Sequence, residues 1–81
     1  MSTAENLTNA LNAALDTARA EYRDAVLELA RHEAAKASSA DREPADVDHI
    51  HHARTRVIAL EAAREEMARM IGDGTPLPAE G

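Results

Sequence analysis

The sequence lacks cysteine, tryptophan and phenylalanine, and Tyr22 is its only aromatic residue. Without cysteine, the chain can form no disulfide bond, thiol nucleophile or cysteine zinc site. The aromatic and β-branched residues that favour strands are few, whereas alanine, arginine, glutamate and leucine are abundant. Because these four residue types are among the best helix formers, we expect helices and no β-sheet.

Hydrophobic runs that approach the about 18 residues of a membrane span are also missing. The chain does not begin with a basic and then apolar leader, so we expect a cytoplasmic protein. Its formal net charge of −6 argues against a nucleic-acid partner, because phosphate contacts need a basic surface. Arginine outnumbers lysine eight to one, which is typical of high-G+C bacterial or phage genomes.

Glycine and proline, the residues that break helices, occupy few positions. They are Pro44, Gly72, members of the segment 74–78, and Gly81. The rest of the chain predicts helices over residues 3–37 and 44–71, separated by a polar turn. We therefore expect a single helical hairpin domain over residues 1–72 and a flexible C-terminal tail over residues 73–81.

Local residues indicate where these helices begin and end. Ser2 and Glu5 lie at the spacing of a capping box, in which a hydroxyl accepts an early backbone N–H. Pro44 suits the first turn of the second helix because its missing N–H would have no partner there. Gly72 suits the position that follows the last helical turn.

Both predicted helices repeat apolar residues at alternating intervals of three and four, as in a coiled coil. The repeats are Leu11, Leu15, Ala18, Tyr22, Ala25 and Leu29 in the first helix, and Ile50, Ala53, Val57, Leu60, Arg64, Met67 and Ile71 in the second, where Arg64 is a charged residue at a seam position. The predicted fold class is all-α, an antiparallel two-helix hairpin. A turn centred on Asp41 would place Ala25 opposite Val57 and Leu15 opposite Met67.

The predicted hairpin has a small core, because nineteen of the thirty-six apolar residues of the chain are alanine. A chain of this size seldom gains more than about 3–5 kcal/mol of net stability from a single core. We therefore expect the hairpin to be completed to a four-helix bundle, either by dimerisation or by docking on a helical protein partner. The candidate contact residues are Leu7, Leu11, Val26, Ile58, Met67 and Met70.

Histidine and aspartate gather at the start of the second predicted helix, where three- and four-residue spacings bring side chains to a common face. The hairpin would bring His32, with Glu28 one turn earlier, close to this cluster. The candidate metal ligands are His32, Asp46, His49 and His52. A divalent metal in a four-helix assembly is thus one hypothesis, and solvated, pH-sensitive histidines without any cofactor are the other.

No nucleophile elbow, phosphate-binding glycine loop or pair of carboxylates in an apolar setting is present, so we expect no enzymatic activity. The sequence favours a non-enzymatic protein–protein interaction or assembly module whose partner is itself or another helical protein. An alternative is an acidic inhibitor of a basic protein, resembling an antitoxin in its action, because opposite charge speeds association. We expect neither nucleic acid nor a membrane as a partner.

Overall fold

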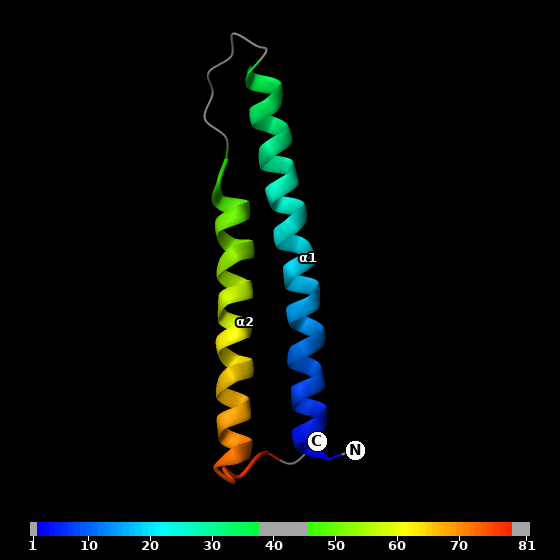
Figure 1. Ribbon diagram of the computed structural model, residues 1–81, viewed down its shortest axis with the longest axis vertical. Coiled ribbons are helices and arrows are strands. Elements are labelled where there is room, and N and C mark those ends of the chain that lie inside the picture. Colours follow the sequence, from blue (N-terminus) through cyan, green and yellow to red (C-terminus); the bar gives the residue numbers. More distant parts are fainter. Residues whose placement is uncertain (1, 38–45, 79–81) are drawn as a thin grey trace.

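Two antiparallel helices form the fold. The computed structural model describes residues 2–37 and 46–78, and it contains α1 (Thr3–Ala37) and α2 (Asp48–Gly72). The two helices pack side by side in a body of 60 × 19 × 19 Å (Figure 1). The described ranges contain no strand, so the all-helical, two-helix prediction is confirmed.

Helix α1 has the predicted bounds and the predicted N-terminal cap. The Ser2 hydroxyl oxygen accepts a hydrogen bond from the backbone N–H of Glu5, at 3.1 Å. This bond satisfies one of the first N–H groups of the helix, which have no partner within it. Glu5 in the first turn and Lys36 in the last turn also carry the charges that the helix dipole favours.

Replacing Ser2 by alanine should destabilise the hairpin by about 1 kcal/mol, because the Glu5 N–H loses its side-chain acceptor. Ser2→Asp keeps an acceptor at this position and should retain the stability of the wild type. Urea denaturation followed by circular dichroism measures both changes. Equal losses of stability in the two variants would show that the hydroxyl does not act as a cap.

Helix α2 begins later than predicted. Pro44 lies outside the described residues, but Asp46 and Val47 precede the helix, which starts at Asp48. The Asp46 carboxylate oxygen Oδ1 accepts the backbone N–H of Asp48 at 2.9 Å. Aspartate side chains commonly form such bonds with backbone N–H groups just before a helix. Helix α2 thus starts four residues later than the predicted start at Pro44.

The predicted end of α2 is also corrected, because Gly72 is still helical and Gly74 performs the terminating role. Gly74 has a φ of 72°, in the left-handed region that glycine adopts without a steric penalty. Its N–H donates to the Ile71 carbonyl at 3.2 Å, and the Thr75 N–H donates to the Met70 carbonyl at 2.9 Å. This pair of bonds is the Schellman arrangement, with Gly74 at C′.

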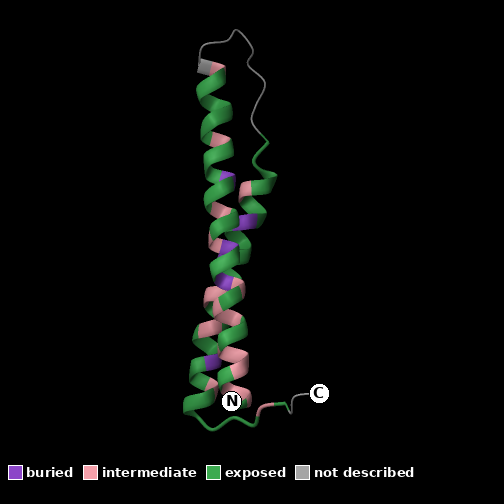
Figure 2. Cartoon of the chain, turned by 90° about the vertical axis from the view of Figure 1, so that its right-hand side faces the viewer, coloured by how far each residue is buried: buried purple, intermediate pink, exposed green. Residues whose placement is uncertain are grey.

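Burial is confined to the seam between the helices, as the purple segments in Figure 2 show. The buried hydrophobic residues are Leu15, Ala18, Ala25, Ala53, Val57 and Met67. Leu15, with 0 % exposure, is the one large side chain in the described ranges that is fully buried. It forms a cluster with Ala18 and Val57, against which Tyr22 and Leu60 pack.

The register of the seam differs from the predicted one. A turn centred on Asp41 would place Glu28 opposite Arg54, but Glu28 contacts His49. The same register would pair Ala25 with Val57, whereas Val57 clusters with Leu15 and Ala18, about two to three turns nearer the start of α1. Helix α2 starts late and has 25 residues against 35 in α1, so the end of α1 extends past the start of α2 (Figure 1).

Candidate functional site

A cleft of about 310 Å³ lies between the C-terminal half of α1 and the start of α2. Its apolar lining consists of Ala25, Leu29 and Ile50. The remaining lining residues have imidazole or carboxylate side chains, and we call them the cleft cluster: Glu28, His32, Asp46 and His49. The cleft thus combines an apolar wall with four side chains of the types that bind metal ions.

One direct contact links the two sides of the cleft cluster. His49 Nδ1 lies 3.5 Å from Glu28 Oε2, and both side chains are largely exposed to solvent. Asp46 uses its Oδ1 to hold the first N–H of α2, which fixes this carboxylate at the edge of the cleft. His32 is exposed on α1. The hairpin therefore brings two imidazoles and two carboxylates from separate parts of the chain to one place.

Three of the four predicted metal ligands line this cleft, and His52 does not. The His52 ring instead stands edge-on to His51, with the ring centroids 6.0 Å apart. Within the described ranges, no three His, Asp or Glu side chains are already arranged to hold a metal ion. The structure thus gathers most of the predicted ligands without placing them at coordination distance.

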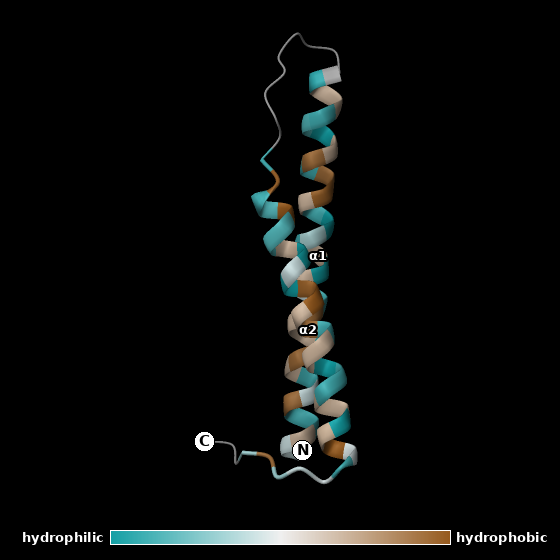
Figure 3. Cartoon of the chain, turned by 90° about the vertical axis from the view of Figure 1, so that its left-hand side faces the viewer, coloured by the Kyte–Doolittle hydropathy of each residue, from teal (hydrophilic) through white to brown (hydrophobic). Residues whose placement is uncertain are grey.

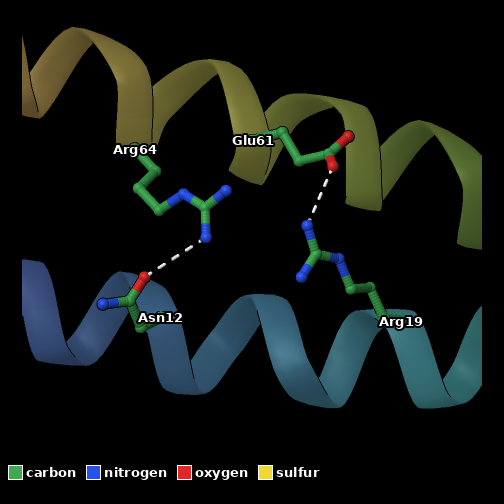
Figure 4. A network of polar contacts seen from close by, with 4 residues as sticks. All are labelled: Asn12, Arg19, Glu61 and Arg64. Carbon is green, nitrogen blue, oxygen red and sulfur yellow. Dashed lines mark hydrogen bonds and ion pairs between the residues drawn. The ribbon is translucent and has the colours of Figure 1, made fainter.

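On one flank of the seam, polar side chains connect the two helices (Figure 4). Arg19 Nη2 donates to Glu61 Oε2 at 3.0 Å, and Arg64 Nη1 donates to Asn12 Oδ1 at 3.5 Å. We call these four residues the polar flank. Sequence reasoning placed Arg64 at the seam but missed the roles of Asn12 and Arg19, although both directly follow seam residues and are one heptad apart.

The opposite flank of the seam changes from apolar to charged along its length. One heptad series on each helix forms it: Leu7, Ala14, Glu21 and Glu28 on α1, and His49, Arg56, Ala63 and Met70 on α2. The contact between Glu28 and His49 places the two series on the same side of the seam. Figure 3 shows how hydrophobic and hydrophilic residues alternate over both helices.

The apolar half of this flank lies near the chain ends, and we call it the apolar patch: Leu7, Ala14, Ala63 and Met70. Ala63 is exposed, and the other three residues are only partly buried within a single chain. The patch faces away from the polar flank, so the two sides of the hairpin differ in chemistry. This asymmetry gives the lower half of the hairpin one water-facing side and one side suited to an apolar contact.

The predicted contact residues do not form one continuous surface. Leu7 and Met70 belong to the apolar patch, and Leu11 lies partly buried beside it. Met67, with 9 % exposure, is buried in the seam of the single chain. Val26 and Ile58 are exposed elsewhere, with Val26 one heptad beyond Arg19 in the series of the polar flank.

No protein-family model, no curated protein and no solved structure matches this chain. In the parts of the chain that the structure describes, neither helix is long and apolar enough to cross a membrane.

Proposed function

We propose that this chain is a non-enzymatic assembly module, in which two helical hairpins associate through their apolar patches into a four-helix bundle. The large exposed surface of the single hairpin carries this proposal. One chain of 8.7 kDa exposes 6020 Å². A compact monomer of that mass would expose about 4,700 Å². The difference of about 1,300 Å² exceeds the about 800 Å² per partner that a standard interface buries.

Charge complementarity favours a second copy as the occupant of the patch. Beyond the apolar patch, towards the connecting segment, the same flank carries Glu21 and Glu28 on α1, and His49 and Arg56 on α2. In a twofold bundle with both hairpins pointing the same way, α1 of one copy lies beside α2 of the other. Glu21 then faces Arg56 of the second copy while the two apolar patches meet, so one arrangement satisfies both halves of the flank.

The small side chains of the patch also suit this contact. Ala14 and Ala63 leave the helix backbones free to approach closely, and Leu7 and Met70 supply the larger apolar groups at the end of the bundle. The polar flank then remains in water, where its ion pair and amide contact need no further partner. The bundle would thus bury the apolar patch, which a single chain leaves in contact with solvent.

Sedimentation equilibrium over a wide concentration range, with circular dichroism on the same samples, tests the proposal. We expect a helical species of about 17 kDa, twice the 8.7 kDa of one chain, both with and without a chelator. A helical monomer at every concentration would reject self-assembly. A poorly helical monomer would also reject it, and would indicate that a different protein completes the fold.

The hypothesis of an acidic inhibitor differs from self-assembly in two ways: the partner is a basic protein and not a second copy of the chain, and the binding depends more strongly on salt. An interaction with a basic protein should weaken steeply as ionic strength rises, because opposite surface charges are then screened. Dimerisation through the apolar patch should depend much less on salt. That hypothesis stays a prediction from the net charge, and no contact in the hairpin favours it over self-assembly.

A further inference from the structure

The cleft cluster and the apolar patch lie at opposite ends of the same flank, and the cluster has a different chemistry. Its imidazole nitrogens and carboxylate oxygens are the donors that zinc and neighbouring divalent transition metals use in proteins. Two donors come from α1 and two from the segment that starts α2. A ligand bound by all of them would therefore join two segments that are held together only weakly in this region.

The pair of Glu28 and His49 can adapt to a metal ion without disturbing the core. The side chains of Glu28 and His49 are already within 3.5 Å of each other across the seam. Both side chains are largely exposed, so rotation about their side-chain bonds displaces solvent and no buried group. The zinc–nitrogen and zinc–oxygen bonds, about 2.0–2.2 Å long, need a shift of this kind.

The apolar wall of the cleft provides the second feature of a site. Ala25 is buried, and Leu29 and Ile50 are partly buried, so one side of the cluster is shielded from bulk water. Reduced access of water strengthens the attraction between a cation and carboxylates. The Asp48 N–H holds Asp46 through one carboxylate oxygen, which orients this ligand as an outer hydrogen bond commonly does in metal sites.

We propose that the cleft cluster binds one divalent transition-metal ion per chain and thereby clasps α1 to the start of α2. Zn²⁺ is the representative ion, because mixed imidazole and carboxylate ligands suit it and no redox chemistry is required. The proposal does not depend on self-assembly, since all four donors belong to one hairpin.

A competing site would lie on α2 alone. His52 is three residues from His49 and four from Asp48, and both spacings bring side chains to a common helix face. Such a site needs His52 but not His32. The clasp across the cleft needs His32 but not His52. These two histidines are both exposed and both helical, so they form a matched pair of substitutions.

Isothermal titration calorimetry of the chelator-treated full chain with ZnCl₂ tests the proposal on the wild type and on His32→Ala and His52→Ala. We expect one Zn²⁺ per chain with micromolar affinity in the wild type. His32→Ala should weaken binding about tenfold or more, since even the loss of an outer-shell partner costs about 10–100-fold. His52→Ala should bind as the wild type does.

Thermal unfolding supplies an independent measurement. A ligand that binds only the folded hairpin, at about a hundredfold excess over its Kd, should raise the unfolding midpoint by about 10 °C or more. His52→Ala should keep this rise and His32→Ala should lose it, with equal helicity in the absence of metal. Binding that depends on His52 and not on His32, or no binding by the wild type, would overturn the clasp.

Discussion

Replacing Leu15 by alanine is expected to abolish the cooperative unfolding of the hairpin at room temperature. Leu15 is fully buried and lies at the centre of the cluster with Ala18 and Val57. Truncating a buried leucine costs about 2–5 kcal/mol, whereas a core of this size supplies only about 3–5 kcal/mol in total. Circular dichroism during urea and thermal denaturation measures the loss.

Leu27→Ala is the matched control, because it makes the same substitution in the same helix at a side chain that is 56 % exposed. We expect it to unfold almost as the wild type does, since little apolar contact is removed. If the two variants lost the same stability, the Leu15 cluster would not be the core of the fold.

Replacing Ala63 by glutamate is expected to raise the dissociation constant of the dimer about a hundredfold or more. Ala63 is exposed in a single chain, so the substitution adds no charge to the core of the hairpin. In the proposed bundle the carboxylate would enter an apolar contact without a partner, and an uncompensated buried charge costs about 3–5 kcal/mol. Sedimentation equilibrium measures the change in association.

Ala62→Glu provides the control for this experiment. Ala62 is also exposed and is the neighbouring residue on α2, but helical geometry turns it about 100° away, to the side of α2 that faces away from α1. We expect this variant to dimerise as the wild type does. Dissociation caused equally by both substitutions would argue against the apolar patch as the contact surface.

The presence of two helices and the bounds of α1 could be predicted from the sequence, but the register in which the helices pack could not. Helix α1 has the expected bounds, because the Ser2 cap and an uninterrupted run of helix formers agree. The ends of α2 depend on local hydrogen bonds that composition does not reveal. The Asp46 side chain accepts the N–H of Asp48, the first residue of α2, and Gly74 rather than Gly72 takes the left-handed conformation.

The cleft could be predicted in part, because the hairpin alone brings His32 towards the start of α2. His52 was counted among the predicted metal ligands because it lies three residues from His49 on the same helix. The heptad pattern distinguishes the two histidines: His49 belongs to the series with Arg56 and Met70 that flanks the seam, whereas His52 lies outside that series. The polar flank was missed because the partners of Arg19 and Asn12 are set by register.

The tightest packing of the hairpin lies far from its connecting segment, and this sets the order in which the helices separate. The cluster of Leu15, Ala18 and Val57 joins residues well separated along the chain, while nearly all the described side chains of α1 beyond Leu29 are exposed. Local opening begins where few apolar contacts exist. The contacts between α1 and α2 should therefore be lost first beside the connecting segment and last at the Leu15 cluster. The two helices would then remain joined near the middle while they are already apart at the connected end.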